Sequence, residues 1–546
     1  MNNFAAHFFR GDRYHYVMAD WALWLWEVLG LQRNNRDTWV RFYATERKVP
    51  YAVALGHEQL FQSLIGHPLD YPRQRFLADD KAALTRVASL LRQPYAGEVR
   101  MLPPATLYFA KQPILDVHGD FAQVQMGEVP IEHVLDLFGT FAFYALDIKL
   151  ASAAADQLCG FDLADAVDLD QKRALTGRPS LSNFALRRLG DPFRSLVASE
   201  VSQVCGWDDT SDVEAGFETD TPTMGTHAHY GVQLAKGLMQ YLLRAGKVDG
   251  LFDEKERPKH FQRWMFETWL DKHPNGTTLL VDTLDLKLGL RHAVEAANSS
   301  PARRKALKFV RVDSRYPPAA ALYARRFLDA NGFSDVGVIV TGDLDAAMLR
   351  VMTRLGLVFG GRITYLMNGV GIGTKYGVEF NHVAGAIFKM TECFGIPTGK
   401  LSDSKSTFPG WLQVRRFSNA MGIITRQDTV LQDEPVRLLP GEYYAVDLLE
   451  PFYGGSGVGV EMKNPLTINE KRTFLWEQIF RLQLPIAEFA RERVGISPAL
   501  KDLMATLAND AIDLNETGVV FPVEEYDECW LEIRAAEERL GISTKS

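Results

Sequence analysis

Four stretches between residues 277 and 374 share one pattern of hydrophobic and polar positions. In each stretch, an apolar run rich in β-branched residues ends in small polar residues, and a helical pattern follows. The runs end roughly 30 residues apart, which is the length of one strand-helix unit. The pattern therefore predicts consecutive parallel strands at TTLLVDT (277–283), ALKFVRVDS (306–314), VGVIVTGD (336–343) and RITYLMNGVGIGT (362–374).

Polar residues stand where each of these strands is expected to end. Strands in such a series are buried on both faces, so their polar residues are confined to the carboxyl ends, which meet at one rim. In an α/β barrel this rim carries the chemistry. The expected rim residues are Asp282, Asp285, Arg311, Asp313, Asp343 and the segment from Gly369 to Thr374.

Segments around this series have other periodicities. Apolar residues recur at helical spacing in some of them, and aromatic and β-branched residues dominate others. The pattern predicts helices at 13–30, 131–160, 319–331 (ending at Asn331-Gly332) and 344–356 (ending at Gly356), and strands at 40–56 with a break at Pro50.

The chain changes character again after Pro409-Gly410, where strands and turns are followed by helical segments. We therefore predict an N-terminal α/β region at 1–135, an α/β barrel catalytic domain at 136–415 and a C-terminal region at 416–546. The pattern alone leaves open whether the third region packs with the first.

Composition limits the classes of partner. The 546 residues are 47% hydrophobic and 23% charged, which is typical of a soluble protein with two or three cores. A net charge of −8 gives no general attraction to nucleic acid or anionic lipid, so we expect neither as a partner. The four cysteines form no C-x-x-C pair, and no export signal or membrane span is apparent. A cytoplasmic location is expected.

The motif His227-Ala228-His229 is the sharpest local feature. Residues two apart on a strand face the same side, so both imidazoles are expected to be able to enter one site. A metal-dependent hydrolase uses such a pair as two ligands, but it needs further ligands, and the other histidines lie in helical patterns or before the strand series. Two hydrogen-bonded structural histidines are the alternative interpretation.

Three further groups of residues suit the binding of anions and sugars. The glycines of Gly369–Thr374 allow backbone N–H groups to approach a phosphate, although a tight strand exit is an equal alternative. The carboxylates at successive strand ends suit ribose hydroxyls or hydrated Mg²⁺, unless they are solvated rim residues. Arg187, Arg188 and Arg311 suit bidentate contacts with phosphate or carboxylate.

Taken in order, ten segments resemble the nicotinate phosphoribosyltransferase family. The resemblance covers most of the span from residue 12 to about 416. The segments are DRYHYVMA (12–19), ERKVP (46–50), FALRR (184–188), WDDTSDVEAG (207–216), GTHAHY (225–230), LLVDTLD (279–285), VRVDS (310–314), TGDLD (341–345), GVGIGT (369–374) and KLSDSKSTFPG (400–410).

The resemblance implies an enzyme of NAD biosynthesis and salvage. It implies transfer of a phosphoribosyl group from phosphoribosyl pyrophosphate to nicotinate, giving nicotinate mononucleotide and pyrophosphate, coupled to ATP hydrolysis through a phosphohistidine. Mg²⁺ is expected to neutralise the separating charges. The implied fold is α/β, an irregular α/β barrel with an additional α/β domain built from the N- and C-terminal regions. The implied assembly is a homodimer with sites shared between subunits.

The resemblance also assigns roles to single residues. His229 matches the phosphorylated histidine, and the catalytic set is completed by Arg311, which matches an anion-binding arginine, and by Asp313 on the ribose side. The matching substrate-binding residues are Tyr14 (from the partner subunit) and Phe184 around the pyridine ring, Thr226 at nicotinate, Arg187 at an anion, Gly342 and Asp343 on the ribose side, and Gly371, Gly373 and Thr374 at the phosphate.

Two positions bear on the alternatives to this function. Ser211 is also expected to bind the substrate. Relatives that use nicotinamide carry an Asp at this position, so Ser211 favours nicotinate over a nicotinamide-using enzyme. Arg315-Tyr316 replaces the Gly-Asp that usually follows the Asp-Ser pair, which motivates a non-catalytic nucleotide-binding relative as a further alternative. The metal-dependent hydrolase is the third alternative.

Overall fold

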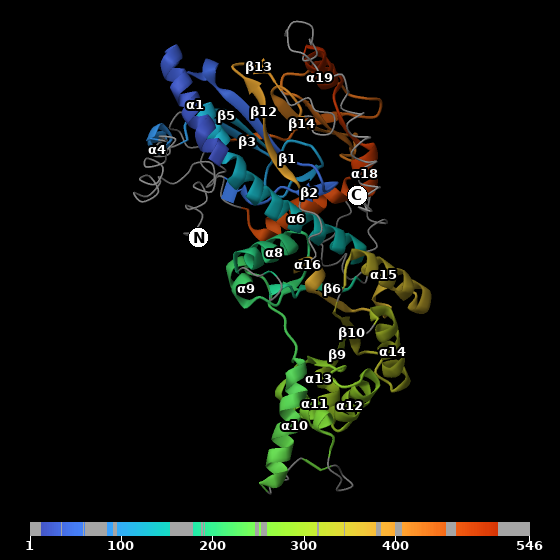
Figure 1. Cartoon of the computed structure of the whole chain (residues 1–546). Coiled ribbons are helices and arrows are strands. Elements are labelled where there is room, and N and C mark those ends of the chain that lie inside the picture. The colour runs from blue at the N-terminus through green and yellow to red at the C-terminus, as the bar shows by residue number, and fades with distance from the viewer. Residues whose placement is uncertain are drawn as a thin grey trace, which may run out of the picture.

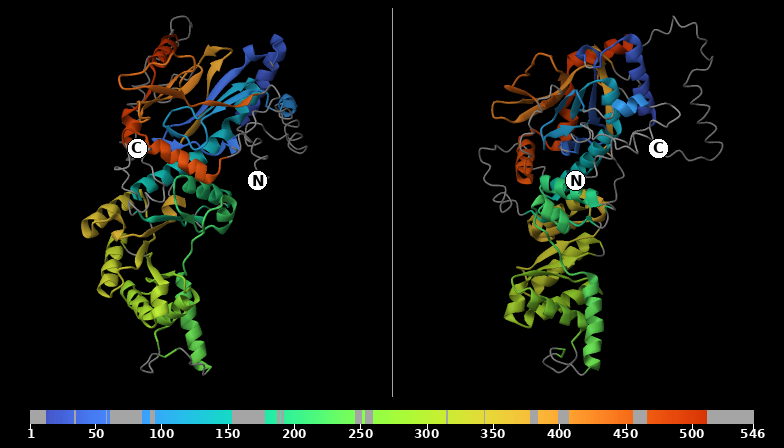
Figure 2. Two further views of the ribbon diagram at one scale, coloured as in Figure 1. Left: turned by 180° about the vertical axis from the view of Figure 1, so that it is seen from behind. Right: turned by 90° about the vertical axis from the view of Figure 1, so that its left-hand side faces the viewer.

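The chain forms an elongated molecule with two bodies, one above the other (Figures 1 and 2). The computed structural model describes residues 13–33, 35–57, 59–60, 85–90, 95–152, 178–186, 189, 192–245, 251–252, 259–313, 316–342, 344–377, 384–398, 407–454 and 466–510. Within these ranges, every helix is too short or too polar to span a bilayer.

The lower body contains a parallel six-stranded sheet. Its order is β7 (Asp209–Thr210), β6 (Ser180–Asn183), β11 (Gly369–Ile372), β10 (Gly337–Val340), β9 (Leu307–Val312) and β8 (Thr277–Leu280). Neighbouring strands pair in parallel throughout. The four predicted strands are therefore confirmed as adjacent strands in chain order, and the α/β fold class is confirmed with them.

The last predicted strand is shorter than expected. Residues 363–365 form a 3-10 turn, η7 (Ile363–Tyr365), and the strand begins only at Gly369. The reason lies in α15 (Ala346–Gly360), because its glycines let the following residues fold back onto it. A Cβ at Gly356 would lie 2.6 Å from the carbonyl oxygen of Ile363, and one at Gly360 would overlap the ring of Tyr365.

Two predicted helix ends have different outcomes. Helix α14 (Pro317–Ala330) ends at Asn331-Gly332 as predicted, and Gly332 has a positive φ of 77°. The prediction that the next helix stops at Gly356 is wrong. Helix α15 continues to Gly360 and is capped by Gly361, whose φ of 66° is left-handed, whereas Gly356 serves a close backbone contact.

A connecting segment joins the two edge strands of the parallel sheet. Thr223 forms a parallel bridge with Thr210 at the β7 edge. Four residues later, His227 Nε2 accepts a hydrogen bond of 2.9 Å from the backbone N–H of Leu280 at the β8 edge. Residues 222–228 therefore run from one edge of the curved sheet to the other and lead into α10 (His229–Arg244).

Helices cover the outer side of this sheet and extend below it (Figure 1). α8 and α9 lie beside β6 and β7, while α11 to α15 follow β7 to β10 in the chain. Their bounds are α8 (Pro192–Val204), α9 (Val213–Thr219), α11 (Phe261–Lys272), α12 (Leu286–Asn298), α13 (Pro301–Ala306) and α16 (Thr374–Gly377).

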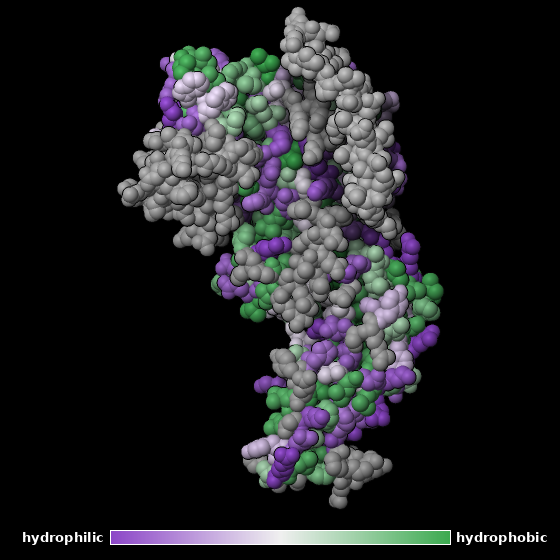
Figure 3. All heavy atoms as spheres, viewed as in Figure 1, coloured by the Kyte–Doolittle hydropathy of each residue, from purple (hydrophilic) through white to green (hydrophobic). Residues whose placement is uncertain are grey.

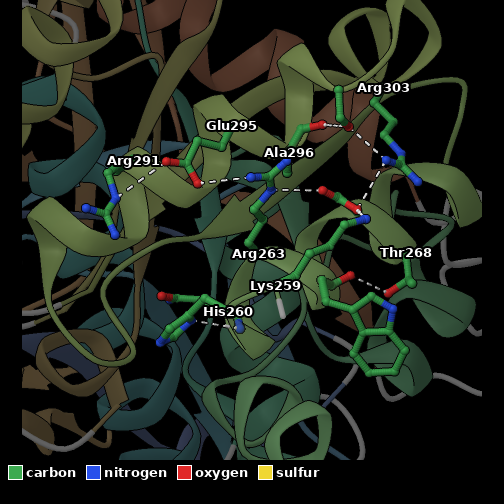
Figure 4. Close-up of polar contacts among 12 residues, drawn as sticks. Lys259, His260, Arg263, Thr268, Arg291, Glu295, Ala296 and Arg303 are labelled. Atoms are coloured by element: carbon green, nitrogen blue, oxygen red, sulfur yellow. Dashed lines mark hydrogen bonds and ion pairs between the residues drawn. The ribbon is translucent and has the colours of Figure 1, made fainter. Parts of the chain in front are cut away.

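An ion network ties α11 to α13 (Figure 4). The carboxylate of Glu267 on α11 is 1% exposed. It lies 2.6 Å from Lys259 Nζ, 3.0 Å from Arg263 Nε and 3.3 Å from Arg303 Nη1. Three cations around one buried carboxylate hold the outer helices together, away from the carboxyl ends of the strands.

The upper body combines strands from distant parts of the chain. Its largest sheet has the order β13 (Ile396–Pro397), β12 (Ala386–Cys393), β1 (Val40–Glu46), β5 (Leu115–Gly119), β3 (Glu98–Met101) and β17 (Glu450–Gly454). Strand β17 of the C-terminal region thus pairs with β3 of the N-terminal region. β12, from the range predicted for the barrel, pairs with β1. The boundaries at 135 and 415 stay a prediction.

Other elements complete the upper body. The predicted helix at 13–30 is confirmed as α1, and the strands around Pro50 are confirmed as β1 and β2. The helix predicted at 131–160 is α6, whose last eight predicted residues lie outside the described ranges. The bounds are α1 (Arg13–Leu29), η2 (Arg36–Thr38), β2 (Tyr51–Val53), α4 (Thr85–Leu90), β4 (Leu107–Phe109), α5 (Phe121–Val124), η3 (Gln125–Gly127), α6 (Glu128–Ser152), β14 (Leu412–Ser418), β15 (Ile424–Leu431), β16 (Tyr444–Asp447), α17 (Ile468–Phe480), α18 (Ile486–Glu492), β18 (Val494–Ile496) and α19 (Pro498–Asp510).

Helix α6 connects the two bodies. It packs on β1, β2 and β12 above and on α8 and α15 below. One cluster of buried apolar side chains accordingly runs from Phe42 and Phe388 in the upper sheet through Phe138 to Val310 and Val340 in the lower one. The lower sheet is therefore anchored to the upper body by a continuous core.

Candidate functional site

Polar side chains from four parts of the lower body meet at the carboxyl ends of its strands. Arg311 and Asp313 come from the end of β9, and Thr341 follows β10. His229 is the first residue of α10, and Thr226 lies in the segment that joins the sheet edges. The sequence predicted that Thr226, His229, Arg311 and Asp313 share a site, and these four residues are linked by the contacts below.

The guanidinium of Arg311 is held by four neighbours. Its Nε donates to Thr341 Oγ1 at 2.9 Å, and its Nη1 donates to Thr226 Oγ1 at 2.8 Å. Its Nη2 lies 3.5 Å from Asp313 Oδ2, and its Cζ lies 5.3 Å from the centre of the Phe184 ring. These contacts hold a permanent positive charge against an aromatic face at the rim.

Asp313 is held ionised in this cluster. Its backbone N–H donates to Asp282 Oδ2 at 2.7 Å, and its Oδ1 accepts from the Thr341 hydroxyl at 2.6 Å. Burial alone would raise the pKa of Asp313, but the Thr341 hydrogen bond and the charges of Arg311 and His229 outweigh it and lower the pKa. A negative charge is therefore present beside Arg311 at neutral pH.

His229 is oriented on both of its nitrogens. Its Nδ1 lies 3.0 Å from Thr283 Oγ1, just beyond β8, and its Nε2 lies 3.6 Å from Asp313 Oδ2. Its side chain is 44% exposed. The imidazole is thus positioned by the protein and still accessible to a bound substrate.

His227 does not share this site, and the expectation that both imidazoles enter one site is wrong. The helix begins at His229, so the two residues do not lie on one strand. His227 is 5% exposed, accepts the Leu280 N–H and packs against Phe266 and Trp269. Burial lowers its pKa to about 4, so the ring is neutral and structural. The described residues contain no group of three or more His, Cys, Asp or Glu side chains that could hold a metal ion.

The predicted glycine loop is partly a strand. Gly369 to Ile372 form β11, whose backbone pairs with β10 and β6, so only Gly373 and Thr374 lie beyond the strand end. Gly371 faces Phe184, because a Cβ there would lie 2.5 Å from the ring. Thr374 is the first residue of α16. A role of these residues in phosphate binding stays a prediction.

Gly342 lies directly beside the cluster. Its φ of 114° is unfavourable for residues with a Cβ, and an added Cβ would lie 3.1 Å from the carbonyl oxygen of Asp313. The backbone after β10 can therefore pass close to the end of β9. Arg187 and Asp343 lie outside the described residues.

Two other predicted substrate-binding residues have separate positions. Ser211 directly follows β7, and its backbone N–H donates to the carbonyl of Asn183 at 2.9 Å. Tyr14 is in α1 of the upper body, so one chain does not bring it to the cluster (Figure 1).

The rim includes residues that the sequence reasoning missed. Thr283 and Thr341 were not singled out, although each lies in the polar end of a predicted strand and carries a hydroxyl. Asp285, expected at the site, instead caps α12 by accepting the backbone N–H groups of Lys287 and Leu288.

A cavity of about 370 Å³ lies in the upper body. Two of the segments that carry the family resemblance meet there, since Arg47 belongs to ERKVP and Phe408 to KLSDSKSTFPG. Lys111 adds a second cation, and burial raises the pKa of the lining Tyr43 to about 12. This cavity is separate from the His229 cluster within one chain.

The chain is similar to known proteins over most of its length. It is 27% identical over 403 residues to the nicotinate phosphoribosyltransferase pncB1 of Mycobacterium tuberculosis, which covers 72% of this chain and 75% of that protein. It is 26% identical over 339 residues to the nicotinate phosphoribosyltransferase of Bacillus subtilis, covering 60% of this chain and 57% of that one. No family model matches the chain.

A solved structure shares the fold. The crystal structure of human nicotinic acid phosphoribosyltransferase aligns with a TM-score of 0.63 and 22% identity, covering 91% of this chain and 99% of that chain. The fold of both bodies therefore also occurs in a known protein.

Proposed function

The chain belongs to the nicotinate phosphoribosyltransferase family, and from this premise we propose that it makes nicotinate mononucleotide in NAD biosynthesis. The reaction is transfer of the phosphoribosyl group of phosphoribosyl pyrophosphate to nicotinate, with release of pyrophosphate. The observation that carries the proposal is the convergence of Arg311, Asp313 and His229 at the carboxyl ends of the strands.

The charges of this cluster suit the bond that must break. Cleavage of the sugar C–O bond leaves positive charge on the ribose and negative charge on the leaving pyrophosphate. A fixed carboxylate such as Asp313 stabilises the first, and a fixed guanidinium such as Arg311 stabilises an anion. Because Thr226 and Thr341 already hold Arg311, little reorganisation is needed during the reaction.

Mg²⁺ fits this cluster as an ion that accompanies the phosphates. Mg²⁺ is commonly bound by one or two carboxylates together with substrate phosphates and water. Asp282 Oδ2 accepts the backbone N–H of Asp313, so both residues are at this rim and could supply such oxygens. When bound, Mg²⁺ would add positive charge near the leaving group.

We further propose that ATP phosphorylates His229. The carboxylate of Asp313 lies on the Nε2 side of the ring and can hold a proton there, which leaves the lone pair of Nδ1 to attack the γ-phosphate as ADP departs. Thr283 orients Nδ1. Hydrolysis of the phosphohistidine would then drive the condensation.

The alternatives are ranked by the geometry. A metal-dependent hydrolase is disfavoured, because His227 is buried and points to Leu280 and not to His229. Ser211 supports nicotinate over nicotinamide as substrate. A non-catalytic relative is motivated by Arg315-Tyr316, where Tyr316 is 58% exposed ahead of α14.

A homodimer would join two features that one chain keeps apart. Tyr14 and the cavity with Arg47 are in the upper body, whereas the His229 cluster is in the lower one. Helix α1 exposes Trp21, Trp24 and Val28, an apolar face suited to a second copy. At this end of the molecule, Figure 3 shows apolar residues interspersed with hydrophilic ones.

One assay tests the proposal. Purified protein is incubated with phosphoribosyl pyrophosphate and Mg²⁺, with nicotinate or nicotinamide, each with and without ATP. We expect nicotinate mononucleotide from nicotinate, with stimulation by ATP. Equal or better use of nicotinamide contradicts the substrate assignment, and donor binding without turnover on either ring favours the non-catalytic alternative.

A further inference from the structure

Asp209 on β7 faces the inside of the curved sheet. Its neighbour Thr210 hydrogen bonds to Ser199 of α8, and Asn183 of β6 bonds to the same hydroxyl, both at 3.2 Å. Because side chains alternate along a strand, Asp209 and its partner Ser182 point to the face opposite α8.

The same face carries the ring-binding residues of the proposed function. Ser182 pairs with Gly371, and the Cβ position of Gly371 faces the Phe184 ring and Thr341. Phe184 and Ser211 lie two residues further along β6 and β7, about 7 Å closer to the rim at roughly 3.3 Å per residue. Asp209 therefore lies one layer deeper in the sheet than Ser211. Its layer continues across the neighbouring strands through Ser182 and Gly371 to Thr341.

The carboxyl of Asp209 is buried with bonding capacity left over. It is 8% exposed, and its Oδ1 is buried without a hydrogen-bond partner. The Ser182 hydroxyl beside it donates to Met224 Sδ at 3.5 Å. A buried polar atom without a partner is uncommon and is a frequent mark of a binding site.

Glycines let neighbouring side chains pack closely on this face of the sheet. Gly369 and Gly371 occupy the inward positions of β11, next to Ser180 and Ser182 of β6. A Cβ at Gly371 would lie 2.5 Å from the Phe184 ring and 2.7 Å from Thr341 Cγ2, so these two side chains already occupy this position. Phe184 therefore packs directly above the layer of the sheet that contains Asp209.

We propose that Asp209 is a further substrate-binding residue, whose protonated carboxyl donates a hydrogen bond to the carboxylate of nicotinate at the floor of the ring site. The inference rests on the proposed function. The ring lies against Phe184, and its carboxylate points down to Asp209. Two carboxylates in one buried site cannot both stay ionised, so Asp209 keeps or takes up one proton from solvent when nicotinate binds.

The surroundings of Asp209 agree with a neutral form. Burial raises its pKa to about 6, and the neighbouring Ser182 offsets only part of this. The elements packed directly against it contribute the uncharged side chains of Ser182 and Met224. The charged groups that reach the rim from elsewhere in the described sheet and α10 are Arg311, Asp313, Asp282 and His229.

The test measures the affinity for nicotinate between pH 5.5 and 8.5 by calorimetry on the full chain. For the wild type, we expect Kd to rise about tenfold per pH unit above pH 6, because each unit lowers the protonated fraction of Asp209 about tenfold. Calorimetry in buffers of different ionisation enthalpy should show uptake of about one proton per nicotinate at pH 8. Asp209→Asn keeps a neutral donor, so its Kd should not vary with pH. Asp209→Ala should bind weakly at every pH.

Asp220→Asn is the matched control. Asp220 is exposed at the end of α9 with a φ of 50°, a conformation that Asn tolerates well. This variant should keep the pH dependence of the wild type. A pH-independent Kd in the wild type overturns the inference, and so does a pH dependence of Kd in Asp209→Asn that equals that of the wild type. In either case, turnover of nicotinate leaves the proposed function standing. If nicotinate neither binds nor reacts, the proposed function fails and the inference falls with it.

Discussion

The guanidinium of Arg311 donates a hydrogen bond of 2.8 Å to the hydroxyl of Thr226, which joins β9 to the segment that runs between the two sheet edges. The same side chain reaches Thr341 with its Nε. One arginine thus fixes three pieces of chain at the place where charge must be stabilised.

Arg311→Lys should therefore impair catalysis without removing the charge. A lysine has one nitrogen on a flexible stem and cannot bond Thr226 and Thr341 together in this geometry. We expect kcat/KM for phosphoribosyl transfer to fall about 100-fold, which corresponds to about 2.7 kcal/mol of transition-state stabilisation. Steady-state kinetics together with a thermal melt would check this. Wild-type kinetics in the lysine variant would contradict the role assigned to Arg311.

His229→Ala should abolish an acid-labile phosphate derived from ATP and leave the fold intact. The imidazole is half exposed and its contacts with Thr283 and Asp313 are at the rim, so little packing is lost. Labelling with γ-phosphate-labelled ATP, followed by acid treatment, measures the effect.

His227→Ala is the contrasting variant. It should retain the label, but it leaves the Leu280 N–H unpaired beside Phe266 and should lower the free energy of unfolding by about 1–3 kcal/mol. Loss of the label in His227→Ala with retention in His229→Ala would reverse the assignment of the two histidines.

The strand series could be predicted from local patterns, because apolar β-branched runs ending in Asp or Thr depend only on neighbouring residues. The placement of Arg311 and Asp313 at one rim could also be predicted, because the carboxyl ends of parallel strands lie at the same edge of a sheet. The different roles of His227 and His229 could not be predicted this way. Helix α10 begins after Ala228, which has no side-chain hydrogen bond to the helix, so the usual Ser, Thr, Asp or Asn signal for a helix start is missing.

Long-range pairing accounts for other differences. Nothing in the local sequence of β12 or β17 indicates that they pair with β1 and β3, since such contacts join residues hundreds of positions apart. Gly356 resembled a helix end because glycine commonly terminates helices. Its actual reason is the close approach of the Ile363 carbonyl, which depends on tertiary packing.

Glu46 should make the stability of the protein depend on pH. It is fully buried against Gly139 of α6, and burial raises its pKa from 4.5 to about 8, an effect that the neighbouring Tyr108 offsets only in part. The folded protein therefore holds this proton where the unfolded chain has lost it. The resulting stability is fully present below about pH 4.5 and is lost as the pH rises through about 8.

Glu46→Gln keeps a neutral side chain and should remove this dependence. Between pH 6 and pH 9, the free energy of unfolding of the wild type should fall relative to the variant by on the order of a few kcal/mol. Urea unfolding at several pH values measures the difference. Glu218→Gln, an exposed residue of α9, is the control and should track the wild type. Parallel pH profiles for Glu46→Gln and wild type would rule out a neutral Glu46.

Glu267→Gln should strongly destabilise the lower body. The change leaves Lys259, Arg263 and Arg303 around a neutral side chain in a buried position. Removing one partner from a buried ionic group typically costs about 3–5 kcal/mol, because the remaining charges are uncompensated. The neighbouring Glu295→Gln variant removes a carboxylate that is 38% exposed and should cost less than about 1 kcal/mol. Denaturant unfolding of both variants measures the contrast, and equal losses would show that Glu267 does not hold α11 to α13 together.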